Sequence, residues 1–148
     1  MVWAARLLKL ANYLLFRAIL PYQAEIERDI ALEHYGLGVV IHPNVTLGHG
    51  VRIYHHVTLA SETWIGSPHR IRVGDGTMIG AGAVLLCKRE RDLVIGAGAV
   101  VGANAVVTRD VAPGQTVVGA PARPVERRTN GAPVEAGMAA MGGWWGAP

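Results

Sequence analysis

Histidines are the residues of this chain best suited to chemistry near neutral pH, because free imidazole has a pKa of about 6.5. The chain has 148 residues, six of them histidines. Four of these lie in one stretch, IHPNVTLGHGVRIYHHVTLA, at residues 41–60. A histidine there could accept a proton from a hydroxyl group, bind a metal ion or belong to the scaffold. The spacing of the aliphatic residues around the histidines bears on this choice.

Aliphatic residues recur at every sixth position and change phase twice. A strand alone has a period of two, so a period of six indicates a short strand plus a turn, wound repeatedly around an axis. The sixth-position residues predicted to point inward are Ile41, Leu47, Ile53, Leu59, Ile65, Val73, Ile79, Leu85, Ile95, Val101 and Val107. Small or aliphatic residues such as Val45 and Ala83 follow four places on. The repeat predicts an all-β fold, a parallel β-helix over residues 22–125.

Two polar segments interrupt the period, SETWIGSPHR at residues 61–70 and LCKRERDL at residues 86–93. A compact coil has no need of them, and loops on a rigid scaffold often carry functional sites. We therefore expect functional residues in both insertions.

The composition fits a turn-rich β protein, with 19 Gly, 8 Pro and 17% charged residues. The net charge of +3 is scattered along the chain and aromatic residues are few, which argues against nucleic-acid binding. The one cysteine, Cys87, cannot form an internal disulfide, so a cytoplasmic location is expected.

The two ends of the chain lack the six-residue period. Residues 1–21 are predicted to form an amphipathic helix that Pro21 stops. Its three cations argue against a membrane-spanning helix, but it could cap the β-helix, pack in an oligomer or contact a membrane surface peripherally. Residues 126–148 are rich in Gly, Ala and Pro and are predicted to be a flexible tail.

Several runs together resemble the hexapeptide-repeat acyltransferases: the hexads, IRVGDGTMIGAGAVLL, VIGAGAVVGANAVVTRDVAPG and VVGAPARPV. More narrowly, LEHYGLGVVIHPNVTLG followed by IYHHVTLA is similar to serine O-acetyltransferase and its short relatives. The resemblance covers residues 24–125. It implies a left-handed parallel β-helix, a handedness that the spacing does not show. It also implies a homotrimer that binds acetyl-CoA between neighbouring prisms and acetylates a small-molecule hydroxyl acceptor.

The resemblance also implies site residues. The acidic residue and catalytic base of the family match Glu33 and His34, and a second histidine matches His69, although the residue order around it differs. The alanines that approach the pantetheine arm of CoA match Ala81 and Ala103. A histidine base would take the hydroxyl proton as the oxygen attacks the thioester.

Neighbouring residues suggest further roles. Glu33 could bind a substrate amine, or orient His34 if the chain turns at the glycines that follow. Arg70 could bind a substrate carboxylate through two hydrogen bonds. Lys88, Arg89 and Arg91 could bind the CoA phosphates or form a solvated loop.

The chain also departs from the family. It has no counterpart of the aspartate that orients the catalytic histidine, nor of the acidic residue that the long helical domain contributes to serine binding. It also lacks the C-terminal isoleucine that docks into cysteine synthase, so a complex with that enzyme is not expected. Serine, a sugar and other hydroxyl metabolites remain alternative acceptors.

The sequence allows three other interpretations of the protein's function. A non-catalytic β-helix scaffold would use the helix and the tail as contacts. The zinc site of γ-class carbonic anhydrases needs two histidines five residues apart, and no pair here has that spacing, so no metal is expected. Cys87 is a weak candidate for an acyl-carrying nucleophile, because no histidine lies near it in the sequence.

Overall fold

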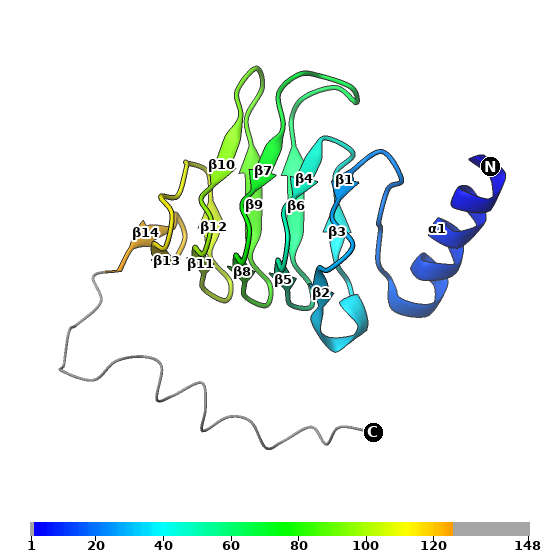
Figure 1. Cartoon of the computed structure of the whole chain (residues 1–148), viewed down its shortest axis with the longest axis horizontal. Helices are drawn as coiled ribbons and strands as arrows, with labels where there is room; N and C mark the ends of the chain where they lie inside the picture. Colours follow the sequence, from blue (N-terminus) through cyan, green and yellow to red (C-terminus); the bar gives the residue numbers. More distant parts are fainter. Residues whose placement is uncertain (1, 126–148) are drawn as a thin grey trace.

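The structure, a computed structural model, describes residues 2–125. These residues form one α-helix, α1 (Val2–Phe16), followed by a three-sided prism of stacked β-coils that includes a short 3₁₀ helix, η1 (Glu33–Gly36) (Figure 1). The predicted β fold with a short N-terminal helix is therefore confirmed. The predicted tail at residues 126–148 lies outside the described residues.

Each full coil contributes one strand to each of three sheets. The first sheet contains β1 (Glu25–Ile26), β4 (Val45–Leu47), β7 (Ile71–Val73) and β10 (Leu93–Ile95). The second contains β2 (Ala31–Leu32), β5 (Arg52–Ile53), β8 (Met78–Ile79), β11 (Val100–Val101), β13 (Thr116–Val118) and β14 (Arg123–Pro124). The third contains β3 (Val40–Ile41), β6 (Thr58–Ser61), β9 (Val84–Cys87) and β12 (Val106–Val107). All neighbouring strands are parallel except β13 and β14, which are antiparallel.

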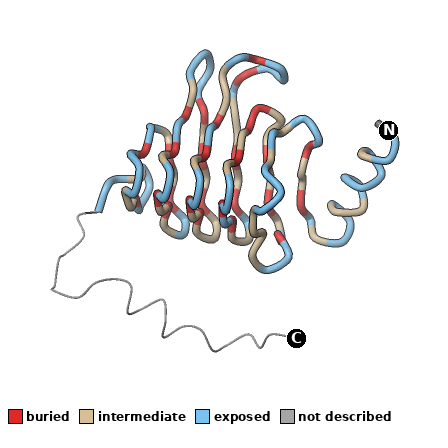
Figure 2. Tube along the Cα trace, viewed as in Figure 1, coloured by how far each residue is buried: buried red, intermediate tan, exposed pale blue. Residues whose placement is uncertain are grey.

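The core is a set of aliphatic columns that run along the inside of the prism (Figure 2). Leu47 in β4 pairs in register with Val73 in β7, and Ile53 in β5 pairs with Ile79 in β8. Aliphatic side chains of successive coils therefore stack on one another. The residues four places on, such as Val45, are buried as well. Each buried aliphatic side chain contributes roughly 1.5 to 3 kcal/mol to stability, so the repeat provides the main driving force for the fold.

The prediction for Ile65 is wrong, since its side chain is 62% exposed. The chain leaves the prism after β6 ends at Ser61 and returns only at Ile71, so Ile65 lies in the inserted loop. Ile71 is the residue that returns to the core, where it pairs with Val45.

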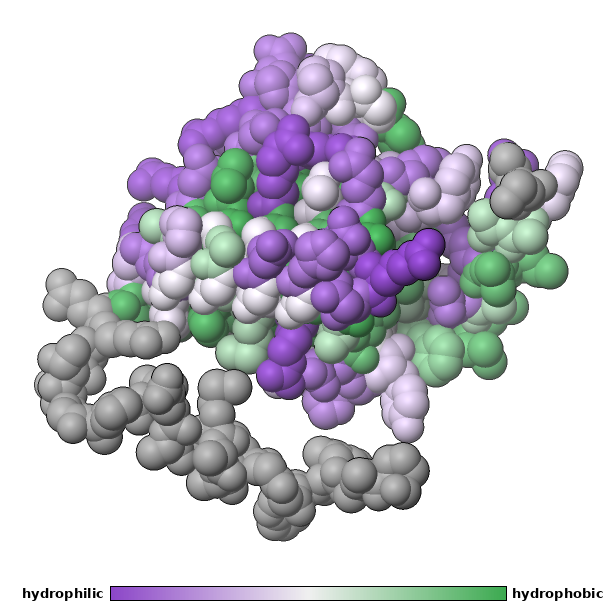
Figure 3. Space-filling view, viewed as in Figure 1, coloured by the Kyte–Doolittle hydropathy of each residue, from purple (hydrophilic) through white to green (hydrophobic). Residues whose placement is uncertain are grey.

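Helix α1 ends at Phe16 rather than at residue 20. Arg17 has a left-handed φ of 55°, which ends the helix, and Ile19 then forms a parallel bridge with Val40. The helix projects from the end of the prism as a hydrophobic surface (Figure 3). Its exposed apolar side chains are Trp3, Leu7, Leu8, Leu10, Tyr13, Leu14 and Leu15. Within residues 2–125, no helix is long and apolar enough to cross a membrane.

The three sheets meet at three edges. The His34 edge joins the second sheet to the third and consists of residues 33–39, 54–57, 80–83 and 102–105. The insertion edge joins the third sheet to the next coil of the first and consists of residues 42–44, 62–70, 88–92 and 108–110. The third edge joins the first sheet to the second and consists of residues 27–30, 48–51, 74–77 and 96–99. Both insertions thus project from the same edge.

Candidate functional site

The His34 edge is a column of turns stacked by backbone hydrogen bonds. The His56 amide donates to the Leu37 carbonyl (2.8 Å), the Gly82 amide to the His55 carbonyl (3.0 Å) and the Asn104 amide to the Ala81 carbonyl (2.9 Å). The predicted residues His34, Ala81 and Ala103 therefore lie along one edge of the prism.

Two pockets lie along this edge. One, of about 340 Å³, is lined by Leu32, Glu33, His34 and Tyr35. The other, of about 290 Å³, lies against the turns of the following coils. Its lining includes Tyr54, Met78, Ala81, Val100 and Ala103. A groove of this kind, next to a histidine, can hold an extended apolar arm of a ligand.

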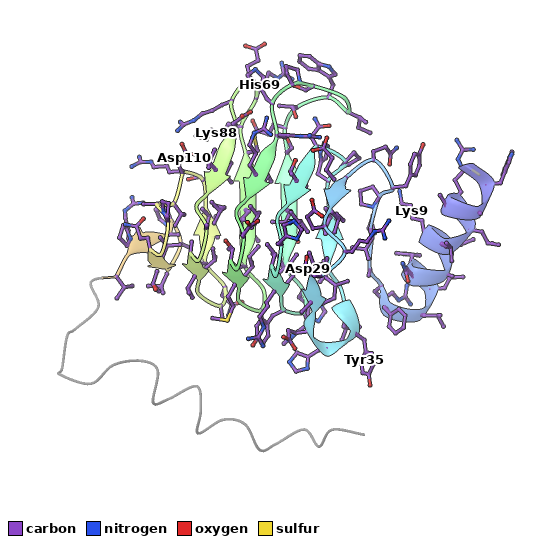
Figure 4. All side chains as sticks on the ribbon, in the orientation of Figure 1. Lys9, Asp29, Tyr35, His69, Lys88 and Asp110 are labelled. Carbon is purple, nitrogen blue, oxygen red and sulfur yellow. The ribbon has the colours of Figure 1, made fainter. Side chains whose placement is uncertain are left out.

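The turn that carries His34 has an unusual backbone. His34, Tyr35 and Gly36 have consecutive left-handed φ values of 52°, 59° and 66°. Residues with side chains rarely adopt this conformation, and such strained residues often occur at functional sites. The predicted turn after Glu33 is present; it places Tyr35 at the tip of the edge (Figure 4), and the adjacent His34 is exposed as well.

The His34 ring packs against two rings of the next coil. The centroids of His34 and His55 are 5.0 Å apart with the rings nearly perpendicular, and the centroids of His34 and Tyr54 are 6.0 Å apart. The Nδ1 atom of His55 is buried without a hydrogen-bond partner. Ring packing therefore fixes His34 on one side and leaves it exposed on the other.

Glu33 points toward Arg52 in β5. The Nε and Nη2 atoms of Arg52 both donate to Oε1 of Glu33, at 3.0 and 2.7 Å. This hydrogen bonding raises the pKa of Arg52 above its ordinary value. In this structure Glu33 forms an ion pair instead of contacting the His34 ring.

His69 lies on the insertion edge (Figure 4), beside a carboxylate that was not predicted from the sequence. Its Nδ1 atom is 3.4 Å from Oδ1 of Asp92, a residue of the second insertion. Burial raises the pKa of Asp92, but hydrogen bonds from the Arg70 amide, Arg72 and His69 outweigh it and hold the pKa below the ordinary value. An ionised Asp92 that accepts from Nδ1 leaves Nε2 of His69 free for chemistry.

Arg70 is also engaged within the chain. Its Nη1 forms an ion pair with Glu25, its side chain is only 17% exposed, and its Nε is buried without a partner. The hydrogen bond from Arg70 is the main reason that the pKa of Glu25 is lowered. The guanidinium predicted to bind a substrate carboxylate thus already binds a carboxylate.

A buried amide holds the first insertion in place. Asn44, which is buried, donates through Nδ2 to Thr63 Oγ1 (3.0 Å) and to the Trp64 carbonyl (2.7 Å), and it accepts from the Gly66 amide (2.9 Å). The His69 amide in turn donates to Oγ of buried Ser67 (3.1 Å). This network makes the position of His69 depend on side-chain contacts.

The second insertion carries the predicted CoA-binding cations. Lys88, Arg89 and Arg91 are all exposed on it, and the Arg89 amide lies 3.4 Å from Oε2 of Glu62 in the first insertion. Cys87, at its start, is buried; burial raises the pKa of the thiol, and Sγ donates to the Arg91 carbonyl (2.7 Å). These features do not favour Cys87 as a nucleophile.

The remaining histidines lie at the prism edges. His42 is on the insertion edge, where burial lowers its pKa and its Nδ1 accepts from the Asn44 amide. His49 is on the third edge, with Nδ1 3.2 Å from Asp29. Among residues 2–125, no group of three or more His, Cys, Asp and Glu side chains is arranged to hold a metal ion.

His34 and His69 lie on different edges of the same chain. In Figure 4, Tyr35, the sequence neighbour of His34, lies at the opposite end of the view from His69. Asp92 and Arg52, which contact the predicted site residues, were not identified from the sequence. His55 was identified only as one of the four histidines of residues 41–60, not as a partner of His34. Asp92 was detectable only as part of a charged insertion, since its proximity to His69 depends on which edge carries both insertions.

No protein-family model matches the chain. The chain is 40% identical to serine acetyltransferase of Mycobacterium tuberculosis over 98 residues, which are 66% of this chain and 41% of that protein. It is 36% identical to serine acetyltransferase of Helicobacter pylori over 104 residues, which are 70% of this chain and 58% of that protein. The chain thus spans about half the length of these curated relatives.

Solved structures of serine acetyltransferases are also similar to this chain. Soybean serine acetyltransferase superposes with a TM-score of 0.70 at 39% identity, over 80% of this chain and 47% of that one. A serine acetyltransferase in complex with CoA superposes with a TM-score of 0.71 at 29% identity, over 83% and 48%. The predicted resemblance and the left-handed parallel β-helix are confirmed.

Proposed function

We propose, from the homology of this β-helix to serine acetyltransferases, that the chain is an acetyl-CoA-dependent O-acetyltransferase with His34 as general base. One observation carries the proposal: the exposed His34 shares an edge with the groove lined by Ala81 and Ala103. The solved serine acetyltransferases that contain CoA support acetyl-CoA as the co-substrate.

The reaction needs no covalent enzyme intermediate. His34 accepts the proton of the acceptor hydroxyl while its oxygen forms a bond to the thioester carbonyl carbon. The carbon–sulfur bond of the tetrahedral intermediate then breaks, and the proton passes from the imidazole to the CoA thiolate. The products are an acetyl ester and free CoA. Backbone N–H groups at the turns of the edge would stabilise the oxyanion.

We propose that the working form is a homotrimer with the site between two copies. His34 and His69 lie on different edges, so they can act together only if the His34 edge of one copy faces the insertion edge of the next. In this arrangement Lys88 and Arg89 would reach the phosphates of CoA bound in the groove between the prisms.

We also propose that α1 contacts an anionic membrane surface. Its leucines are exposed, Arg6 and Lys9 flank them, and no acidic residue occurs before Glu25. Sedimentation with anionic vesicles should recover the protein, and the Leu7→Glu variant should stay in the supernatant. We propose a cytoplasmic location for the acetyl-CoA-dependent reaction, and a peripheral membrane contact is compatible with it.

A thiol-release assay with acetyl-CoA and a panel of hydroxyl acceptors tests the activity. The His34→Ala variant should lose about 10²-fold to 10⁴-fold in kcat, the usual contribution of a general base. The matched control is His49→Ala on the third edge, which should stay near the wild-type rate. Full activity in His34→Ala would refute the assigned base, and no thiol release with any acceptor would favour a non-catalytic scaffold.

A further inference from the structure

We infer that the acceptor is an uncharged polyhydroxyl compound such as a sugar, rather than an amino acid. The inference rests on the proposed acetyltransferase function and specifies the substrate class of that same site. It follows from how the charged and aromatic side chains around His34 and His69 are used within the chain.

An amino acid at neutral pH carries an ammonium and a carboxylate, and its binding site needs a free charge of opposite sign for each. The two groups suited to these roles are Glu33 and Arg70. Glu33 accepts two hydrogen bonds from Arg52, and Arg70 is largely buried in its ion pair with Glu25. A substrate carboxylate would have to displace Glu25 from Arg70, and a substrate ammonium would have to share Glu33 with Arg52 through Oε2, so neither charge of a zwitterion meets an unpaired partner.

The remaining acids near His69 are also engaged. Asp92 interacts with the His69 ring, with the Arg70 amide (3.1 Å) and with Nε of Arg72 (3.2 Å). Glu33 and Asp92, the carboxylates beside the two candidate catalytic histidines, are thus both already paired with a cation or a ring of this chain when a substrate ammonium arrives.

A neutral ion pair suits hydroxyl groups well. Glu33 uses only Oε1 with Arg52, so Oε2 can accept a further hydrogen bond, and the Arg52 guanidinium has N–H groups to donate. A sugar hydroxyl is both a donor and an acceptor, so adjacent hydroxyls can bind to such a pair without breaking it.

An exposed aromatic ring beside the base completes the site. The Tyr35 side chain is 85% exposed and the left-handed turn holds it next to His34, at the pocket of about 340 Å³. Leu32 contributes an apolar wall to the same pocket. The face of an aromatic ring packs well against the C–H face of a pyranose, whereas it offers an amino acid no charged anchor.

The test compares L-serine with methyl α-D-glucopyranoside, methyl α-D-galactopyranoside and N-acetylglucosamine in the thiol-release assay. We expect kcat/KM for the best sugar to exceed that for serine by at least about tenfold, equivalent to about 1.4 kcal/mol. Tyr35→Ala should lower kcat/KM for sugars about tenfold and leave the KM for acetyl-CoA unchanged. The matched control is Tyr22→Ala, an exposed tyrosine outside this pocket.

The outcomes separate the two proposals. If serine is acetylated as well as or better than every sugar in the panel, the acceptor inference is wrong and the acetyltransferase function stands. If no acceptor releases thiol and calorimetry shows no binding of CoA, the proposed acetyltransferase function is wrong. The acceptor inference, which rests on that function, is then wrong as well. An unchanged preference for sugars in Tyr35→Ala would refute the role of that ring.

Discussion

The His34 edge and the insertion edge hold their functional side chains in different ways. Along the His34 edge the turns between strands are short, and left-handed residues such as His56, Gly82 and Asn104 recur in successive coils. Backbone hydrogen bonds between the turns set the position of each residue. On the insertion edge the segments differ in length, and side-chain contacts from Asn44 and Asp92 set the position of His69.

The two edges should therefore tolerate different substitutions. On the His34 edge, a substitution of one side chain leaves the turn in place, so it should report on chemistry alone. On the insertion edge, removal of a supporting side chain should also move the histidine that it supports. Although the coils repeat one pattern, the two edges thus differ in use. The His34 edge is suited to binding an invariant part of a ligand, and the insertion edge is suited to changes of loop length and sequence.

The largest expected effect comes from separating the two edges. His34→Ala and His69→Ala should each lose about 10²-fold to 10⁴-fold in kcat when expressed alone. When both are expressed together in equal amounts and assemble at random, roughly one site in three of each mixed trimer combines an intact His34 with an intact His69. Because about three quarters of all trimers are mixed, activity should recover to about a quarter of wild type.

The control for this recovery is His34→Ala expressed with a His34→Ala, His69→Ala double variant, which can form no intact site. Different affinity tags on the two chains confirm that the trimers are mixed. Mixed trimers that stay inactive would show that the two edges do not form a shared site.

A smaller effect should follow from Asp92→Asn, which keeps the size of the side chain but loses the charge beside His69. We expect kcat to fall about tenfold, with the KM for acetyl-CoA unchanged. In the nitrogen NMR shifts of His69, the Nε2 atom should lose its unprotonated character, because the amide no longer requires a proton on Nδ1. An intact tautomer together with a lowered kcat would limit Asp92 to a structural role.

The lowered pKa of Asp92 also predicts the pH dependence of this variant's stability. Because the folded-state pKa lies below the unfolded value, the carboxylate stabilises the fold above about pH 4 and loses this effect as the pH falls through the folded-state pKa. The side chain is 37% exposed, so the difference should be at most about 1 kcal/mol. Urea unfolding of both proteins near pH 7 and pH 3 measures it, and a difference that grows toward acid pH would contradict the assignment.

The sequence was sufficient to predict the stacked coils but not the contacts that the site residues make. The six-residue period predicted which side chains fill the core, because burial depends on one local repeat. The same period failed at Ile65, where the chain had already left the prism. The ion pair of Glu33 with Arg52 and the contact of His69 with Asp92 join residues 19 and 23 positions apart, and these follow from coil stacking and loop length rather than from local pattern.

The smallest effect should come from the groove of the His34 edge, and it tests whether that edge alone binds the co-substrate. Ala103→Leu places a bulky side chain in the groove lined by Ala81, Val100 and Tyr54. We expect the KM for acetyl-CoA to rise about fivefold to tenfold with little change in kcat, since about 1 kcal/mol of binding would be lost equally from ground and transition states. The matched control is Ala97→Leu on the third edge, which should leave the KM unchanged: Ala97 is also exposed and also follows a turn glycine, in Gly-Ala-Gly where Ala103 lies in Gly-Ala-Asn. Equal effects of the two leucines would mean that the groove is not specific to the His34 edge, and the contrast between the edges would then reduce to the position of the histidines.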